Sequence, residues 1–219
     1  LNCGQTCVAP DFIYCDKSIK DKLVEELKKQ IIIQYTDDQI GNENYPKMIN
    51  QKHFDKVKSY IEEGRVLFGG KSDEEKLKIQ PTILDSTFDS PEMCQEVFGP
   101  VLPIVTFEDL DEAIAKVNSM STPLAFYFFS EDKVNQKKIK MYCKFGGGCI
   151  NDTIMHIASS TLPFGGLKQS GMGKYHGKAG FDTFTHYKSI IDKKTWYDLP
   201  TRYQPYTDFK YKLIKFFMK

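Results

Sequence analysis

The stretch VLPIVTFEDLDEAIAKVNSMSTPLAFYFFSEDKVNQKKIKMYCKFGGGCIN, residues 101–151, decides the fold class, because apolar runs alternate with helical patterns along it. Val101–Phe107 predicts a strand, and the helix that follows opens at Asp109 or Asp111 and runs through Met120. The dense apolar and aromatic run at 124–130 is typical of a strand buried on both faces.

A second helix and strand continue the pattern. Residues 131–143 predict a charged surface helix, the glycines at 146–148 end it, and 149–151 predict a short strand. Ser18 and Asp21 resemble a capping box at the start of an earlier helix. The repeated strand–helix–strand order predicts an α/β fold with a mostly parallel, twisted sheet flanked by helices. Further strands are expected at 11–15, 65–68 and 79–84, and helices at 18–33 and 47–63.

The sequence pattern changes in the last part of the chain. Residues 163–181 are glycine-rich and predict irregular backbone close to a ligand or to another segment. One more strand is expected at 183–192, where it would join an oligomer interface, and 196–219 form an aromatic and basic arm. We therefore expect a catalytic domain at 1–182, followed by an oligomerisation strand and arm at 183–219.

Composition excludes several classes of protein. Hydrophobic residues make up 41% and charged residues 27% of the 219 residues, which fits a globular protein. The net charge of +1 gives no reason to expect a nucleic-acid partner. No apolar run approaches the length of a membrane-spanning helix, and no signal peptide is visible. The chain opens without Met, so we expect it to be a piece of something larger.

The six cysteines do not predict a disulfide scaffold in a chain of this length. Free thiols are the expectation, and no metal site is expected because the spacings lack a usual zinc pattern. Cys7 lies in a glycine-led turn, where backbone N–H groups near the sulfur would favour a reactive thiolate. Spacing alone leaves open that Cys7 is a small buried apolar residue. A Cys3–Cys7 redox pair has the wrong spacing for thioredoxin chemistry.

Several segments together resemble one family. GQTCVAPDF at 4–12 is similar to the active-site segment of NAD(P)-dependent aldehyde dehydrogenases, in the form used by the class 3 and fatty aldehyde dehydrogenase branch. EVFGP at 96–100 resembles the E-x-F-G-P motif of that family. PFGG at 163–166 and SGMG at 170–173 follow in family order, and YHGK at 175–178 is similar to the class 3 tail.

The resemblance implies a mechanism for the catalytic part of the protein. The Cys7 thiolate would attack an aldehyde to give a thiohemiacetal, whose oxyanion the Cys7 N–H and an asparagine would hold. Hydride transfer to NAD or NADP would give a thioester, which a glutamate-activated water would hydrolyse to the acid. In the family, the asparagine, the glutamate and most of the cofactor-binding domain precede the nucleophile, so they are expected before Leu1.

Further site residues follow from the same resemblance. Glu96 and Phe98 match residues that contact the ribose on the nicotinamide side of the cofactor. Phe164 matches a wall of the aldehyde pocket, and Asn151 would orient water or a carbonyl beside it. The residues alone favour a different interpretation, in which Glu96 is a solvated helix residue and Phe98 belongs to the core. His156 and His176 are expected to be hydrogen-bonded structural histidines.

The expected partners are a small aldehyde, with a medium-chain, long-chain or aromatic group, and a second copy of the chain in a homodimer. The arm at 206–219 has a helical stripe of apolar side chains flanked by lysines. It would dock over the dimer or lie on a membrane surface, with docking preferred. We expect a cytoplasmic location, with the surface of the endoplasmic reticulum as the membrane alternative. A different function, a non-catalytic oligomerisation or scaffold piece, also fits a partial chain.

Overall fold

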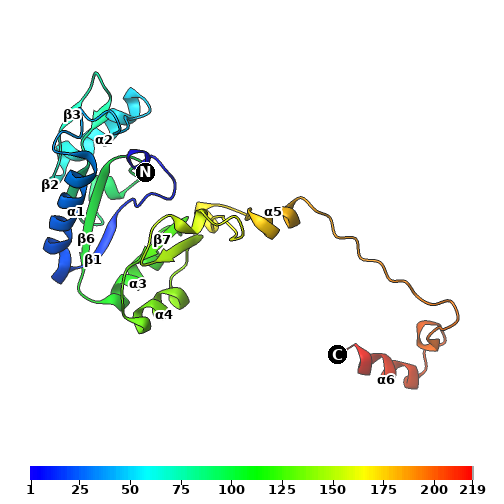
Figure 1. The fold of residues 1–219 in the computed structure, drawn as a ribbon. Coiled ribbons are helices and arrows are strands. Elements are labelled where there is room, and N and C mark those ends of the chain that lie inside the picture. Colours follow the sequence, from blue (N-terminus) through cyan, green and yellow to red (C-terminus); the bar gives the residue numbers. More distant parts are fainter. Residues whose placement is uncertain (219) are drawn as a thin grey trace. The chain divides into compact units, whose positions relative to one another are not determined.

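The computed structural model describes residues 1–218 of the chain, which divides into two units, Leu1–Phe184 and Thr185–Lys219. Figure 1 shows two separate groups of strands within the first unit, one around β6 and one around β7. The strands are β1 (Ile13–Asp16), β2 (Arg65–Phe68), β3 (Ser72–Asp73), β4 (Lys78–Ile79), β5 (Thr82–Asp85), β6 (Val101–Phe107), β7 (Ala125–Phe128) and β8 (Gly147–Ile150). The α-helices are α1 (Lys20–Tyr35), α2 (Gln51–Glu63), α3 (Leu110–Ser119), α4 (Lys133–Tyr142), α5 (Gly177–Thr183) and α6 (Asp208–Phe217).

The larger sheet has the strand order β1–β6–β5–β2. β1, β6 and β5 run parallel, and β2 pairs antiparallel with β5 at the edge. β3 and β4 form a small antiparallel pair, while β7 and β8 form a parallel pair. This order confirms the predicted α/β class, with a mostly parallel sheet and helices between the strands.

Helices cover both faces of the larger sheet. Successive residues of a strand point to opposite faces, so neighbouring residues of β5 contact different helices. Val24 of α1 packs with Ile83 and Ile104 on one face. Phe54 of α2 packs with Leu84 on the other face. Ile83 and Leu84 are neighbours in β5, and both are almost fully buried. Burial of each such side chain contributes roughly 1.5–3 kcal/mol to stability.

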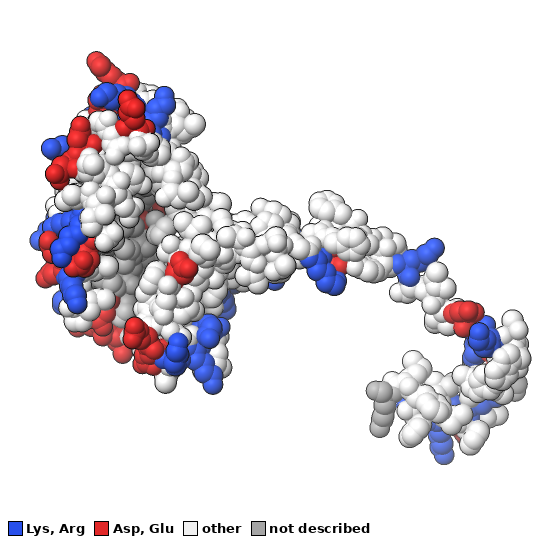
Figure 2. Space-filling view, viewed as in Figure 1, with Lys and Arg blue, Asp and Glu red and all other residues white. Residues whose placement is uncertain are grey.

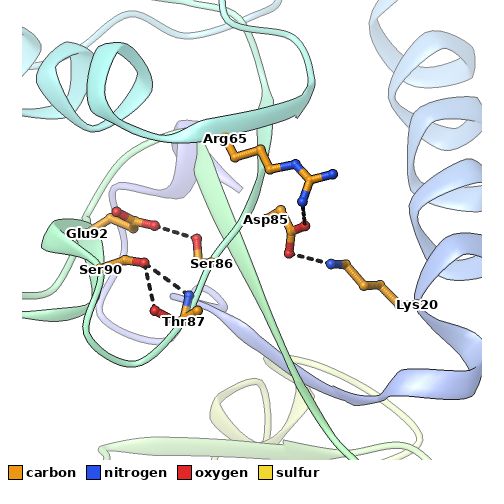
Figure 3. A network of polar contacts seen from close by, with 7 residues as sticks. All are labelled: Lys20, Arg65, Asp85, Ser86, Thr87, Ser90 and Glu92. Atoms are coloured by element: carbon orange, nitrogen blue, oxygen red, sulfur yellow. Dashed lines mark hydrogen bonds and ion pairs between the residues drawn. The ribbon is translucent and has the colours of Figure 1, made fainter.

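Asp85 at the end of β5 joins three elements of this layer (Figure 3). Its carboxylate forms ion pairs with Lys20 of α1 and with Arg65 of β2, the latter at 3.1 Å. The side chains of Lys20 and Asp85 are mostly buried, so water weakens their ion pair less than it weakens a surface pair. Next along the chain, Ser86 donates a hydrogen bond to the buried carboxylate of Glu92.

The smaller sheet is covered differently. Ile114 of α3 and Ile139 of α4 pack with Phe126 and Phe128, so both helices lie on one face of β7. All the residues of β7 are half-buried, and Phe129 after it is exposed. The prediction of a strand buried on both faces was therefore wrong. Within residues 1–218, β7 pairs only with β8, and no helix of the described chain packs on the other face through the cores named above.

The glycines at 146–148 do not end a helix, as the sequence had suggested. α4 ends at Tyr142, and β8 starts at Gly147, two residues earlier than the predicted strand. A Cβ at Gly148 would lie 1.9 Å from the carbonyl oxygen of Phe126. Glycine is thus required where β8 approaches β7 closely, and it belongs to the strand.

Three expected boundaries also moved for local reasons. Asp16, and not Ser18, caps the first helical turn, because its carboxylate accepts the backbone N–H of Ser18 at 2.8 Å. Asn50 accepts the N–H of His53, so α2 begins at residue 51 and not at 47. The strand expected at 79–84 is interrupted at Pro81, which lies between β4 and β5.

The second unit contains a short 3-10 turn, Pro200–Arg202, and α6, whose first turn is capped by the Thr207 side chain. The strand expected at 183–192 does not form within the described chain: α5 extends through Thr183, and no strand follows it. A strand needs a partner for its backbone groups, and within the described residues this segment pairs with none. Phe209, Phe216 and Phe217 of α6 are all exposed. In residues 1–218, no helix is long and apolar enough to cross a membrane.

Candidate active site

The loop that carries Cys7 gives its two cysteines opposite environments. Cys7 is exposed, whereas Cys3 is buried and donates a hydrogen bond to the Tyr45 hydroxyl at 3.2 Å. Burial raises the pKa of the Cys3 thiol, with the Tyr45 hydrogen bond opposing the rise. Cys3 is therefore an inert structural thiol, and the reading of Cys7 as buried apolar filler does not hold.

Gln5 fixes the loop on the side that precedes Cys7. Its amide donates to the Lys47 carbonyl at 3.0 Å and accepts the Ile49 N–H at 2.9 Å. This two-sided contact attaches the loop to the segment that enters α2. The backbone at Gly4 packs closely against Gly99, because a Cβ at position 4 would lie 2.2 Å from the Gly99 carbonyl oxygen.

Tyr127 of β7 fixes the loop on the side that follows Cys7. Its hydroxyl donates a 2.6 Å hydrogen bond to the carbonyl of Val8, and Val8 is itself buried. The loop is thus anchored to a residue 119 positions later in the sequence. Cys7 lies exposed between two fixed points, Gln5 and Val8, an arrangement suited to a nucleophile that must meet a substrate.

The segment at 96–98 lies against the same region of the chain. Asp11 accepts the N–H of Val97 at 2.8 Å, and its carboxylate also receives a backbone hydrogen bond from Phe98. His53 of α2 contacts the Phe98 carbonyl at 2.7 Å through its Nε2 atom. Phe98 has a φ of 52°, a left-handed conformation that a side chain other than glycine rarely adopts. Contacts from two elements hold this strained turn.

Glu96 is exposed and lies in no helix, so the alternative of a solvated helix residue is not what the structure shows. Partial burial raises the pKa of its carboxyl, the Asp11 carboxylate adds to the rise, and Lys56 opposes it. Lys56 also donates to the Glu96 backbone carbonyl at 3.0 Å. An exposed carboxylate beside a half-buried aromatic ring, Phe98, fits the two hydroxyls and the apolar face of a ribose.

Phe164 belongs to an aromatic group in the glycine-rich segment. It forms an isolated antiparallel bridge with Tyr175, and its ring centroid lies 6.2 Å from that of His156 and 6.0 Å from that of His176. Figure 2 shows few charged side chains on the surface between the part around α1–α4 and the region of α5. Exposed apolar side chains of this segment include Met155, Leu162, Leu167 and Met172.

Two predictions for this segment change. Asn151 uses both ends of its amide on Ser130, accepting its N–H at 2.8 Å and donating to its carbonyl at 3.0 Å. This contact holds the ends of β7 and β8 together, which argues against a role for Asn151 in orienting a substrate. His156 and His176 each retain one buried ring nitrogen with no hydrogen-bond partner in the described structure, so they are not fully satisfied. Burial lowers the pKa of His156.

The structure therefore places the loop that carries Cys7 against the turn that carries Glu96 and Phe98, through the Asp11–Val97 hydrogen bond and the close approach of Gly4 to Gly99. It also places Phe164 next to His156, whose ring lies 5.9 Å from the Tyr127 ring. Sequence reasoning missed the residues that do the fixing, which are Gln5, Asp11, His53 and Tyr127. Gln5 and Asp11 lie inside the quoted motif and were the only ones with a signal. Within residues 1–218, no group of three or more His, Cys, Asp or Glu side chains could hold a metal ion.

The comparison with family models decides the family, because the model of the aldehyde dehydrogenase family matches residues 1–190. The chain belongs to the aldehyde dehydrogenase family. It is 46% identical to the 4,4'-diaponeurosporen-aldehyde dehydrogenase of Staphylococcus aureus over 100% of this chain and 48% of that protein. It is also 46% identical to the dimeric NADP-preferring aldehyde dehydrogenase of Rattus norvegicus over 88% of this chain and 43% of that protein.

A solved structure agrees with the sequence relatives. The substrate-bound state of Staphylococcus aureus AldH superposes with a TM-score of 0.93 at 45% identity, covering 99% of this chain and 48% of that chain. The predicted aldehyde dehydrogenase resemblance, including its class 3 branch, is confirmed. The chain spans about half the length of the relatives that it matches.

Proposed function

We propose that the protein containing this chain oxidises an aldehyde to a carboxylic acid, with Cys7 as the nucleophile and NAD or NADP as the hydride acceptor. The observation that carries this proposal is the position of Cys7, exposed on a loop that Gln5 and Tyr127 anchor on either side. The same loop lies against the Glu96–Phe98 turn, through Gly4 and Asp11.

The reaction would begin when the Cys7 thiolate attacks the carbonyl carbon, forming a C–S bond and placing the π-electron pair on oxygen. The Cys7 backbone N–H would donate to that oxyanion, and one such donor is worth about 3–4 kcal/mol in comparable sites. NAD or NADP, held at Glu96 and Phe98, would supply the hydride acceptor that the conversion of the thiohemiacetal to a thioester requires. Water then adds to the thioester and releases the acid and the thiol. The glutamate base and the asparagine donor that the family resemblance implies are assigned to no residue of this chain.

Glu96 and Phe98 would hold the cofactor ribose. The carboxylate of Glu96 is free to accept hydroxyl hydrogen bonds, since Lys56 bonds only to its backbone carbonyl. Phe98 has a strained, positive φ, and contacts from Asp11 and His53 hold the turn in which it lies. Because one relative is named NADP-preferring, NADP is included with NAD as the expected cofactor.

Phe164 would form a wall of the aldehyde site, since its aromatic neighbours and the exposed apolar side chains of Leu162 and Leu167 favour an apolar group on the substrate. We therefore propose a medium-chain, long-chain or aromatic aldehyde as the substrate, within lipid or related aldehyde metabolism. Asn151 is left out of the site because Ser130 engages its amide.

We propose that the protein is a homodimer, in keeping with a relative that is named dimeric. Residues 1–182 would be the catalytic part and 183–219 the oligomerisation strand and arm, the strand forming only when a partner's sheet edge pairs with it. The exposed aromatic side chains of α6 would be covered by the dimer, or else would contact a membrane surface from the cytoplasmic side, such as that of the endoplasmic reticulum.

The decisive test is Cys7→Ser in the full-length protein, with Cys94→Ser as the matched control, because Cys94 is the other exposed cysteine among the described residues. We expect Cys7→Ser to lower kcat for hexanal, hexadecanal or benzaldehyde by about a thousandfold or more, because a hydroxyl is a far weaker nucleophile. Cofactor binding, measured by fluorescence titration, should persist. The control should keep the wild-type rate.

Retained turnover in Cys7→Ser would reject the proposal. The alternative, a non-catalytic oligomerisation or scaffold piece, predicts no aldehyde-dependent reduction of either nucleotide by the wild-type full-length protein. The coverage of about half of each relative is the observation that keeps this alternative in view.

A further inference from the structure

Tyr127 lies on the face of β7 that α3 and α4 do not cover. Phe126 and Phe128 point to those helices, so the residue between them points to the opposite side. In the parallel register, Tyr127 pairs with Cys149 of β8. The Cys149 sulfur in turn lies 3.7 Å from the Nδ1 atom of His156. One face of the β7–β8 sheet therefore carries polar and thiol side chains, and the other face carries the side chains that pack in the hydrophobic core.

The Tyr127 hydroxyl is a junction between segments that are distant in sequence. It donates to the Val8 carbonyl at 2.6 Å, one residue after Cys7, and it also receives a hydrogen bond from the backbone of Ile154. Burial raises the pKa of this hydroxyl, the Ile154 contact opposes the rise, and the Cys149 and Cys7 thiols add to it. The hydroxyl therefore keeps its proton at neutral pH and remains a donor.

The Tyr127 ring makes the second half of the connection. Its centroid lies 5.9 Å from the His156 ring, and His156 lies 6.2 Å from Phe164. Ile154, whose φ is 67°, enters the 3-10 turn Met155–Ile157 that carries His156. A single side chain thus contacts the reactive loop, the entry to this turn and the aromatic group around Phe164.

We infer that Tyr127 is a positioning residue that couples the orientation of Cys7 to the Phe164 wall of the aldehyde site. The inference rests on the proposed function for the roles of Cys7 and Phe164. The bond to Val8 fixes the peptide that follows Cys7, and so restricts where the sulfur and the Cys7 N–H point. When a bulky aldehyde displaces the Phe164 ring, the His156 and Tyr127 rings move with it and shift the peptide that follows Cys7.

The test is Tyr127→Phe, which removes one oxygen atom, with Tyr142→Phe as the matched control, because Tyr142 is exposed at the end of α4. Both variants are made in the full-length protein. We expect Tyr127→Phe to lower kcat about 10- to 100-fold, the size of effect that a small misplacement of reacting groups produces. KM for the aldehyde should change less than about threefold, because the pocket wall itself is retained. The control should match the wild type in both.

A second readout does not depend on the dehydrogenase reaction. The rate of Cys7 alkylation by iodoacetamide, followed against pH and located by mass spectrometry, should fall at least about threefold at neutral pH in Tyr127→Phe. The reason is that the peptide after Cys7 is no longer fixed by the contact to Val8, so the sulfur is held less often in one exposed orientation. A role in folding alone would lower the thermal midpoint but leave this pH profile unchanged. If the proposed function fails while the alkylation change remains, the positioning role still stands.

The conservative variant guards against misfolding of Tyr127→Phe. A protein with 4-aminophenylalanine at position 127 keeps an N–H donor for the Val8 carbonyl, so it should recover most of kcat and of the alkylation rate. Wild-type kcat and alkylation in Tyr127→Phe would overturn the inference. So would a 4-aminophenylalanine protein that folds with the wild-type thermal midpoint and yet recovers neither rate.

Discussion

The β1–β6–β5–β2 sheet and the β7–β8 sheet of the first unit both carry helices, but they differ in how their faces are covered. The β1–β6–β5–β2 sheet has α1 on one face and α2 on the other, and its central residues, such as Ile83 and Leu84, are almost fully buried. The β7–β8 sheet has both its helices on one face and leaves Tyr127 and Cys149 on the other. The first sheet buries its central side chains on both faces, whereas the second leaves one face open, from which Tyr127 contacts the loop that carries Cys7.

The largest expected effect on stability comes from the covered sheet. Phe54→Ala should lower the free energy of unfolding by about 3–5 kcal/mol, because Phe54 is fully buried between α2 and β5 and leaves a cavity. Phe126→Ala, in half-buried β7, should cost about half as much or less. Urea unfolding of both variants checks the ratio. Equal losses would break the distinction between the sheets.

A smaller effect should come from closing the gap between β7 and β8. Gly148→Ala places a Cβ against the Phe126 carbonyl, so the strands must separate at a cost of about 1–3 kcal/mol. The proposed turnover should fall with it, because Tyr127 and Cys149 lie in the next register pair. Gly180→Ala in α5 is the control, since a Cβ there meets ordinary contacts and alanine favours the helix. Wild-type stability and activity in Gly148→Ala would show that the close approach is not needed.

The smallest effect concerns pH and the contact between the loop and the 96–98 turn. Burial raises the pKa of the Asp11 carboxyl above its usual value of 3.8, with backbone hydrogen bonds from Val97 and Phe98 opposing the rise. A raised pKa in the folded state means that the protonated form favours folding, and this contribution disappears as the pH rises above about 4 through the folded pKa.

Asp11→Asn keeps an acceptor for the Val97 N–H but removes that titration. Its stability should therefore change less between pH 4 and pH 7 than that of the wild type, and at pH 7 it should differ by only about 1 kcal/mol. Thermal unfolding at several pH values measures both. A steeper pH dependence in the variant would contradict the assigned direction of the pKa shift.

Local patterns were sufficient for most helices and strands of the first unit. The apolar spacing in Val101–Phe107 and in the helix after it predicted β6 and α3 almost at their observed ends. The assignment of Cys7 came from the resemblance of GQTCVAPDF to a family segment, whereas the adjacent residues alone favoured a small buried residue at that position. Neighbouring residues also explain the misplaced caps: Asp16 and Asn50 competed with Ser18 and Lys47 for the helix starts and made better acceptors.

Long-range contacts were beyond such patterns. The Gln5 contact to Lys47 spans 42 positions and the Tyr127 contact to Val8 spans 119, and periodicity carries no information at those separations. The burial of β7 was overestimated because LAFYFFS is as apolar as a strand covered on both sides, while its actual cover depends on where α3 and α4 pack. The strand expected at 183–192 does not form within residues 1–218, where this segment pairs with no other strand.

The close approach of Gly4 to Gly99 limits which amino acids the loop that carries Cys7 can contain. Gly4 combines a φ of 74° with a backbone carbonyl only 2.2 Å from any added Cβ, so no other amino acid fits without rebuilding both turns. Gly99 is less restricted, because its added Cβ would meet the movable side chain of Val57 at 3.0 Å. Random mutagenesis of the two positions should therefore give surviving clones with occasional replacements at position 99 but with only glycine at position 4.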